Sequence, residues 1–337
     1  MIEALIEFLD RRQQDYPDSL ALGECLGDLV HEKLDRLPLP GGGRTLERWQ
    51  ALACVAGHDL GVCKLYEGHT DALAIMAELD APPCEPGSTW GTWAAEPPQA
   101  RVRVTGTGDS VRVSGRKAWC SGAAVVSHGL LTAWDENDQQ QLVAVPMQQP
   151  GVHVTQDGWR AIGMAATGSV DIELNEAWGW RVGGPGDYVA RPGFWHGGIG
   201  IAAVWYGAAP SIAHRLLEHA EQHSEPHALA HLGAVDVALH GASTVLRSAA
   251  DELDRSPAQN AEVLARRCRA RIEYAAERVM HHVGRALGAG VYCKDARFAR
   301  LSADLPVFLR QSHAERDLEA LGRLASTRLR SEKAWQL

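Results

Sequence analysis

The sequence predicts an α+β fold with an N-terminal helical domain, a middle antiparallel β domain and a C-terminal four-helix bundle. Two changes in hydrophobic periodicity support this prediction. Apolar residues recur every three or four positions up to about residue 79, alternate from about 90 to 182, and return to the helical period from about 197 to 330. We therefore expect three domains, at residues 1–85, 86–188 and 189–337.

The N-terminal part has the spacing of amphipathic helices, as in Leu46, Trp49, Leu52 and Ala53. A Pro- and Gly-rich break, "LPLPGGGRT" at 37–45, separates two helical pieces, and Thr45 is a candidate N-cap for the second. The segment "DAPPCEPGST" at 80–89 then ends the helical region.

The middle part has strand periodicity and turn signals. Val102 and Val104 face Val111 and Val113 in a predicted hairpin with "GTGDS" as its turn, and residues 125–146 form a second. "GVHVT" and "GSVDIELN" supply two more strands. We expect a small antiparallel sheet or barrel whose apolar face needs helices to cover it.

The C-terminal part contains three long, Ala-rich helical runs at 197–223, 226–254 and 260–290, and a fourth at 306–329. Long antiparallel helices of this kind are typical of a bundle. Their many small residues allow bundles to pack on other bundles, so we expect a homodimer or homotetramer.

Composition excludes several classes of protein. The 337 residues are 45% hydrophobic and 22% charged, as in ordinary globular proteins, and the net charge of −9 argues against a nucleic-acid partner. We find no run of about 18 to 20 apolar residues and no signal sequence at the start, so we expect a cytoplasmic protein without a membrane partner. The seven cysteines include no C-x-x-C pair, which indicates reduced thiols and no metal site.

The order helix, sheet, bundle resembles the acyl-CoA dehydrogenase family, and four motifs add to the resemblance. "GRKAWCSGA" at 115–123 resembles the family's G-x-K-x-W-I-T-N-G strand, and "AIGMAATGS" at 161–169 its G-x-R-x-T-x-S segment. "WAAEPPQA" at 93–100 resembles its T-E-P turn, and "ALGAGVY" at 286–292 its late glycine turn. The resemblance covers essentially the whole chain.

The resemblance implies an FAD cofactor that lies against the "GRKAWCSGA" strand. An isoalloxazine is flat, and the indole of Trp119 offers a matching face worth about 0.5 to 1.5 kcal/mol beyond burial. Alternation places the Ser121 hydroxyl on the same side as Trp119 and turns Cys120 to the other face. An ordinary sheet-core role for Trp119 stays open. The full set of implied cofactor-binding positions is Trp93, Ala95 (where Thr is usual), Trp119, Cys120, Ser121 and Thr167.

The family's catalytic carboxylate is missing from both of its usual positions. Removing an α-proton from a thioester requires a positioned base. The two positions fall near Ser312 or His313 and at Ala190, and neither is a carboxylate. Glu315 is close in sequence to the first and is one candidate base, and His313 is an alternative acid or base near neutral pH. Arg191 and Trp195 are candidate substrate contacts at the mouth of the site.

The leading interpretation is an FAD-dependent oxidoreductase that oxidises an acyl thioester or related acyl substrate and passes electrons to an electron-transfer flavoprotein or to oxygen. Two alternatives stay open: a flavin monooxygenase of the same fold supplied by a flavin reductase, and a non-catalytic binding or assembly module. The alternatives have support because the Gly-Ser-Asp loop after the T-E-P turn is absent, and "HSEPHALAHLG" replaces the family's FAD-binding Arg and Gln.

Overall fold

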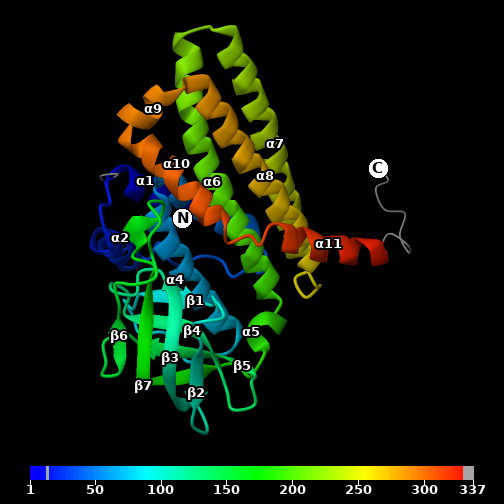
Figure 1. Ribbon diagram of the computed structural model, residues 1–337. Helices are drawn as coiled ribbons and strands as arrows, with labels where there is room; N and C mark the ends of the chain where they lie inside the picture. Colours follow the sequence, from blue (N-terminus) through cyan, green and yellow to red (C-terminus); the bar gives the residue numbers. More distant parts are fainter. Residues whose placement is uncertain (13–14, 329–337) are drawn as a thin grey trace. The chain divides into compact units, whose positions relative to one another are not determined.

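The computed structural model describes residues 1–12 and 15–328 and divides the chain into two compact units (Figure 1). The first unit comprises Met1–Leu37 and Asp59–Phe194, and the second comprises Pro38–His58 and Trp195–Leu337. The predicted N-terminal helical domain is therefore shared between the units. The predicted domain boundaries after residues 85 and 188 stay predictions. The last residues of the predicted C-terminal domain, 329–337, lie outside the described part of the chain.

The helices of the first unit are α1 (Ile2–Asp10), α2 (Ser19–His31), α4 (Leu60–Glu78) and the short α5 (Asp187–Ala190). Two of them begin at an aspartate whose carboxylate accepts a backbone N–H of the first turn. Asp18 accepts from Ala21 at 3.0 Å and Asp59 from Val62 at 2.9 Å. Such caps satisfy amides that a helix start leaves without partners, which explains where α2 and α4 begin.

The sheet of the first unit has seven strands: β1 (Trp90–Trp93), β2 (Val102–Thr105), β3 (Ser110–Cys120), β4 (His128–Trp134), β5 (Gln140–Pro146), β6 (Val152–Val154) and β7 (Val170–Val182). Both predicted hairpins are confirmed, with Val104 opposite Val113 and Leu131 opposite Val143. Strand pairing runs β4–β2–β3–β7–β5 and returns from β5 to β4, which closes a barrel. The barrel is mostly antiparallel, but β2 pairs with β4 in parallel where Arg103 lies opposite Trp134, and β1 also joins β4 in parallel.

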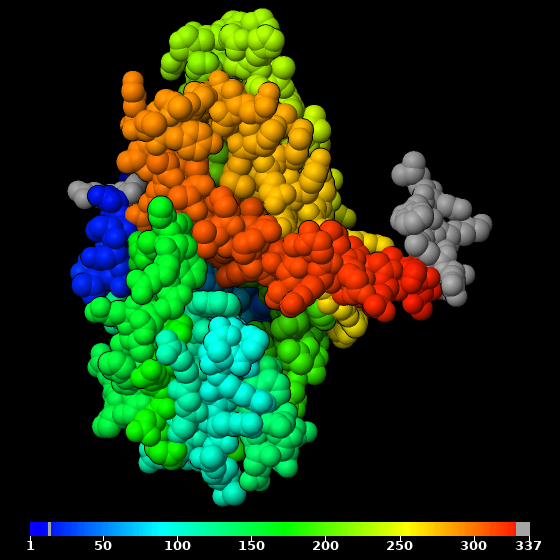
Figure 2. Space-filling model, in the orientation of Figure 1, coloured from blue at the N-terminus to red at the C-terminus, as the bar shows by residue number. Residues whose placement is uncertain are grey.

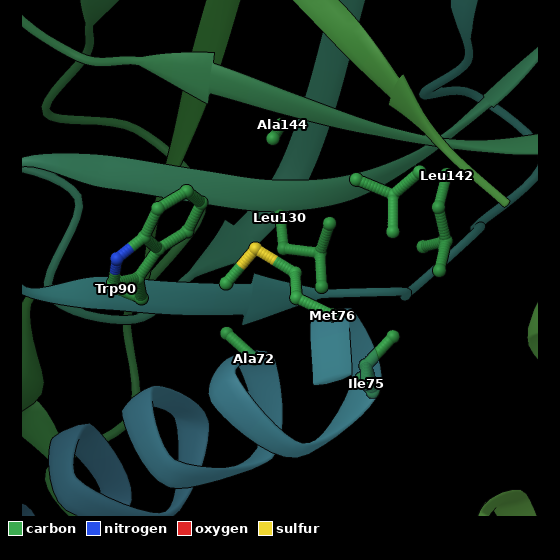
Figure 3. Packing of buried hydrophobic residues seen from close by; sticks show 8 residues of the cluster. Ala72, Ile75, Met76, Trp90, Leu130, Leu142 and Ala144 are labelled. Atoms are coloured by element: carbon green, nitrogen blue, oxygen red, sulfur yellow. The ribbon is translucent and has the colours of Figure 1, made fainter. Parts of the chain in front are cut away.

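Helix α4 covers one face of this sheet (Figure 3). Its apolar side chains Ala72, Ile75 and Met76 form a buried cluster with residues of four strands. The strand members are Trp90, Leu130, Leu142, Ala144 and Val182. Burial of a large apolar side chain contributes about 1.5 to 3 kcal/mol, so this cluster fixes α4 and the loop that follows it on the sheet.

The second unit is helical: α3 (Thr45–His58), most of α6 (Gly193–Gln222), α7 (Pro226–Arg255), α8 (Glu262–Leu287), α9 (Ala289–Lys294), α10 (Ala296–Leu309) and α11 (Glu315–Arg328). The three long predicted helices are confirmed. Thr45 is the first residue of α3, and the carboxylate of Asp254 accepts its N–H at 3.0 Å and that of Gly43 at 3.1 Å. The start of α3 is thus capped by a residue of α7, which local sequence does not indicate.

The prediction of one continuous fourth helix at 306–329 is wrong. Helix α10 ends at Leu309, and α11 begins only at Glu315. Between them Ala314 adopts a left-handed conformation with φ of 45°, and the Ser312 hydroxyl accepts the Ala314 N–H at 3.0 Å. This local hydrogen bond competes with helix continuation and produces a turn at the position expected to carry the catalytic base.

Among the described residues one helix, α7, is long and apolar enough to cross a membrane by length and composition. Only 22% of its apolar window is buried, and α7 packs along α8 (Figure 1). None of the seven cysteines, all of which belong to the described residues, forms a disulfide.

Candidate functional site

Three hydroxyl side chains form a buried chain in the first unit. Ser121 Oγ lies 2.8 Å from Ser169 Oγ, and Ser169 Oγ lies 2.7 Å from Thr167 Oγ1. All three residues are at most 8% exposed. The Gly122 N–H also donates to the Thr167 carbonyl at 2.8 Å. The structure therefore brings two predicted cofactor-binding residues, Ser121 and Thr167, together through a third hydroxyl.

The direction of donation along these three hydroxyls follows from the hydrogen bond that Thr167 makes. Thr167 Oγ1 lies 2.6 Å from the Met164 carbonyl, which only accepts, so the single Thr167 proton goes there. Ser169 must then donate to Thr167, and Ser121 must donate to Ser169. The Ser121 oxygen is left with lone pairs and no free proton, so toward a ligand it is an acceptor.

Trp119 lies just before this chain in an unusual backbone conformation. The register of β3 on β7 shifts between Lys117 and Cys120, and Trp119 has a φ of 58° with 48% of its surface exposed. The left-handed backbone conformation costs an L-amino acid about 1 to 2 kcal/mol. The Asp171 carboxylate holds it by accepting the Trp119 N–H at 3.3 Å, while also accepting from Arg116 Nε at 2.8 Å. An exposed indole on a strained backbone is a feature of a site more than of a core.

The shift in register also interrupts the alternation on which the expected positions of residues 119 to 121 depend. Trp119 is half-exposed, Cys120 is fully buried and Ser121 is buried. Cys120 points into the domain, as expected, but Ser121 follows a bulge and lies in the turn after β3. The alternation rule alone therefore does not place Trp119 and Ser121 on a common face.

Two other predicted positions lie on β1 and the loop after it. Trp93 is 3% exposed, and its Nε1 donates to the Ser121 carbonyl at 3.1 Å. Its ring occupies the space beside Gly91 and Gly129, where a Cβ would come within 2.6 and 2.2 Å of ring atoms. Trp93 therefore supports the backbone of Ser121 from inside the sheet. Ala95, partly buried, carries no hydroxyl for this chain.

An ion pair between buried Lys117 and half-buried Glu96, not foreseen in the sequence, joins two of the motifs. Lys117 Nζ, 1% exposed, lies 2.8 Å from Glu96 Oε1, 2.9 Å from the Thr132 carbonyl and 2.6 Å from the Thr132 hydroxyl. Trp134 Nε1 also donates to Glu96. Burial raises the pKa of Glu96, but the hydrogen bonds from Lys117, Thr132 and Trp134 outweigh it, so the net pKa is lowered. Burial lowers the pKa of Lys117, opposed by Glu96.

The candidate substrate residue Arg191 already has a partner in the first unit. Its guanidinium lies 2.7 Å from Glu78 Oε2 and packs over the Tyr188 ring at 5.4 Å. The other Glu78 oxygen accepts the Gly193 N–H at 2.8 Å. The Glu78 carboxylate of α4 thus lies close in the chain fold to Ala190, one of the two positions where the catalytic carboxylate is missing. Both of its oxygens already accept hydrogen bonds, from Arg191 and from the Gly193 N–H.

In the second unit, Ser312 and His313 lie in the turn between α10 and α11, and Glu315 is the first residue of α11. Ser312 is buried, whereas the His313 side chain is 69% exposed and Glu315 is exposed in the first turn of α11. The space-filling view shows the α11 side chains at the surface (Figure 2). Asp317 accepts the His313 N–H at 3.0 Å, and Arg269 Nη2 donates to the Gln311 carbonyl at 2.9 Å. The turn is therefore fixed at both ends.

The candidate substrate residue Trp195 belongs to the same network. Arg266 lies over the Trp195 ring at 5.0 Å and pairs with Asp317 at 2.8 Å. One aspartate thus links Trp195, through Arg266, to the His313 backbone. The roles assigned to these side chains stay predictions.

Elsewhere in the second unit, the Nδ1 atoms of His231 and His282 lie 2.8 Å apart. Within residues 1–12 and 15–328, no group of three or more His, Cys, Asp or Glu side chains is arranged to hold a metal ion.

Sequence reasoning overlooked Ser169, Asp171, Lys117 and Glu96. A signal existed for three of them: Ser169 is the final Ser of the G-x-R-x-T-x-S pattern, Lys117 is the Lys of "GRKAW", and Glu96 is the Glu of "AEP". Asp171 had no such signal, because its role depends on the register of β7 against β3.

Comparison with solved structures defines the fold. The chain has the acyl-CoA dehydrogenase-like fold and is matched over nearly its whole length by solved structures, two of which were determined with FMN. No protein-family model and no curated protein matches it.

Three of the similar structures illustrate the range. Methanesulfinate monooxygenase MsuC from Pseudomonas fluorescens is 19% identical with a TM-score of 0.78, over 97% of each chain. KijD3, solved with FMN and a dTDP-linked amino sugar, is 18% identical with a TM-score of 0.79, over 99% of this chain and 94% of its own. TdsC from Paenibacillus sp. A11-2, solved with FMN and indole, is 17% identical with a TM-score of 0.76, over 95% of each chain.

Proposed function

We propose that the protein is a flavin-dependent monooxygenase that uses reduced FMN delivered by a separate reductase. The observation that carries this proposal is the direction of the hydroxyl chain, which leaves Ser121 Oγ as an acceptor. Oxidised and reduced flavins differ at the central ring nitrogen, which accepts hydrogen bonds when oxidised and bears an N–H when reduced. An acceptor-only Ser121 suits the reduced form.

Two features of the first unit support contact with the ring system of a flavin. Trp119 offers an exposed indole face, and Ser121 lies two residues on with an acceptor oxygen. In this proposal Trp119 contacts the flavin ring, Ser121 accepts its N–H, and Ser169 with Thr167 keeps Ser121 in that orientation. A bound reduced flavin supplies two electrons to oxygen, so that one oxygen atom enters the substrate and the other leaves as water.

Two further observations favour FMN over FAD and oxygen transfer over acyl dehydrogenation. The Arg and Gln expected for FAD are replaced by "HSEPHALAHLG". The base positions at Ser312 and Ala190 have no carboxylate of their own, and the neighbouring Glu78 is engaged by Arg191 and Gly193. The names of three similar structures agree with this: two contain FMN, and MsuC is called a monooxygenase.

A second candidate, the acyl dehydrogenase, retains one supporting observation. Glu315 lies in the turn region and is solvent-exposed, so its carboxylate is available as a base. In that function the Ser121 hydroxyl would have to donate to an oxidised flavin, which requires it to leave Ser169.

Anaerobic titrations with oxidised and photoreduced FMN test the proposal. We expect reduced FMN to bind about tenfold more tightly, because one net hydrogen bond of about 1.4 kcal/mol separates the two forms. Ser169→Ala should reduce this preference to less than about threefold, since Ser121 is then free to donate. Ser114→Ala, which replaces a half-buried serine of β3 that bonds Glu176, is the matched control and should keep the preference.

The other outcomes identify the competing functions. Bleaching of bound oxidised flavin by a panel of acyl-CoA thioesters under anaerobic conditions would support the dehydrogenase. A protein that binds neither form of FMN, nor FAD, would support the non-catalytic module.

A further inference from the structure

A pocket lies in the first unit, on the face of the sheet that α4 covers. The pocket, of about 1000 Å³, opens between the loop that follows α4 and the edges of four strands. Its lining shares no residue with the Trp119, Ser121 and Thr167 site. Trp90 and Trp93 occupy opposite ends of β1, about 10 Å apart at the usual rise, so the two sites are separated along that strand.

Aromatic rings form one wall of this pocket. The His128 imidazole stacks on Trp90 with centroids 4.5 Å apart and planes at 17°. Trp180 presents its edge to both rings, at 6.0 and 5.9 Å, and Trp178 lies 5.4 Å from Trp180 with 39% of its surface exposed. A wall of this kind suits a flat ring that packs against Trp178 and Trp180.

Hydrogen bonds fix the Trp178 and Trp90 rings before any ligand arrives. Trp178 Nε1 donates to Ser110 Oγ and its backbone N–H to Gln149 Oε1, both at 2.8 Å. Trp90 Nε1 donates to Ser88 Oγ at 2.9 Å. A preformed wall lowers the ordering cost of binding.

The tautomer of His128 follows from its neighbour Ser127. Ser127 Oγ lies 2.8 Å from the Thr89 carbonyl, which can only accept, so the Ser127 proton points there. His128 Nδ1, 2.9 Å from the same Oγ, must therefore be the donor. In the neutral ring this leaves Nε2 as a bare acceptor. The structure gives Nε2 no hydrogen-bond partner among the described residues.

Charge around the pocket restricts the ligand further. Three carboxylates, Asp80, Glu85 and Asp109, line it with one guanidinium, Arg181. Arg181 already donates to the carbonyls of Gly106 and Gly108 at 3.0 and 3.1 Å. The pocket therefore disfavours anions.

We propose that this pocket binds a flat aromatic small molecule, neutral or cationic, that donates an N–H to His128 Nε2 while its ring packs on Trp178 and Trp180. The site does not depend on the flavin function. Burial lowers the pKa of His128 below its ordinary value, and the nearby Glu85 opposes this only in part. The lowered pKa keeps Nε2 unprotonated at neutral pH. The other titratable and charged groups of the lining are Asp80, Cys84, Asp109 and Arg181.

Binding of three matched probes to the full chain at pH 7.5, followed by ligand-detected NMR and calorimetry, tests the proposal. Benzimidazole carries the N–H, 1-methylbenzimidazole lacks it, and benzimidazole-5-carboxylate adds a negative charge. We expect benzimidazole to bind about tenfold more tightly than the methylated probe and the carboxylate to bind more weakly than benzimidazole. Absence of binding by all three, or equal affinity of the first two, would overturn the proposal.

Variants locate the site. His128→Phe keeps a ring on Trp90 but removes the acceptor, so both neutral probes should bind equally. Trp178→Ala removes a rim ring and should weaken both while keeping their ratio. Tyr274→Leu, which replaces a 56% exposed aromatic of the second unit, is the control and should change neither.

Two further measurements keep the proposal testable if His128→Phe does not fold. The ¹⁵N shifts of His128 in the wild-type protein should report an Nδ1–H tautomer, and the opposite tautomer would contradict the proposal. Saturating FMN should leave benzimidazole affinity unchanged, whereas displacement would assign the pocket to the flavin site.

Discussion

The ammonium of Lys117 lies 2.8 Å from the carboxylate of Glu96, and this pair joins strand β3 to the turn after β1. The two residues belong to separate sequence motifs, and the backbone around Trp119 and Ser121 follows directly after Lys117. Breaking a buried ion pair leaves an uncompensated charge and costs about 3 to 5 kcal/mol, while replacing both partners by apolar residues is often neutral.

We therefore predict that Glu96→Ala lowers the free energy of unfolding by about 3 kcal/mol or more, since Lys117 would stay buried without its partner. The double variant Glu96→Leu/Lys117→Met should recover most of this loss. Chemical denaturation measures the free energy of unfolding of both variants, provided that the dependence on denaturant concentration keeps the slope of the wild-type protein. A loss below about 1 kcal/mol for the single variant would contradict the assignment of a stabilising role.

Trp119 provides a test that separates stability from binding. Asn tolerates a positive φ, so Trp119→Asn relieves strain of about 1 to 2 kcal/mol while losing the burial of half an indole. We expect the free energy of unfolding to change by less than about 1 kcal/mol and FMN affinity to fall at least tenfold. Denaturation and FMN titration measure the two quantities. Large destabilisation with unchanged affinity would indicate a core role instead.

Asp317 should control the order of the turn that carries His313. Its carboxylate accepts the His313 N–H and pairs with Arg266, so Asp317→Ala removes both contacts. We expect amide exchange at His313 to accelerate at least tenfold, as measured by hydrogen–deuterium exchange. Glu319→Ala, on the same helix and paired with exposed Arg323, is the control and should leave the turn unchanged.

His128 should make stability depend on pH. Burial lowers its pKa below the ordinary 6.5, so the unfolded chain binds more protons than the folded protein once the pH falls through that value. The free energy of unfolding should therefore decrease as the pH drops below about 6.5 and level off below the folded pKa. His128→Phe should flatten this part of the profile, and NMR titration of the ring should give the lowered pKa directly.

The elements of the fold were largely predictable from periodicity. The β2–β3 and β4–β5 hairpins and the three long helices match their predicted positions. The prediction of a continuous helix through 310–314 was wrong because the spacing of apolar residues does not indicate the local Ser312 hydrogen bond or the left-handed conformation of Ala314. The capping of α3 by Asp254 was likewise out of reach, since the two are 209 positions apart.

The candidate site was predictable only in its residue types. Residue order alone establishes that an indole and a hydroxyl stand two positions apart at the end of a strand, and that positions 190 and 312 carry no carboxylate. The tertiary structure decided that Trp119 is exposed on a bulge held by Asp171, and that Ser121 is an acceptor. The physical reason is that hydrogen-bond direction depends on which carbonyl lies at the end of a chain, here Met164 beside Thr167. Strand pairing and turn geometry bring these atoms together.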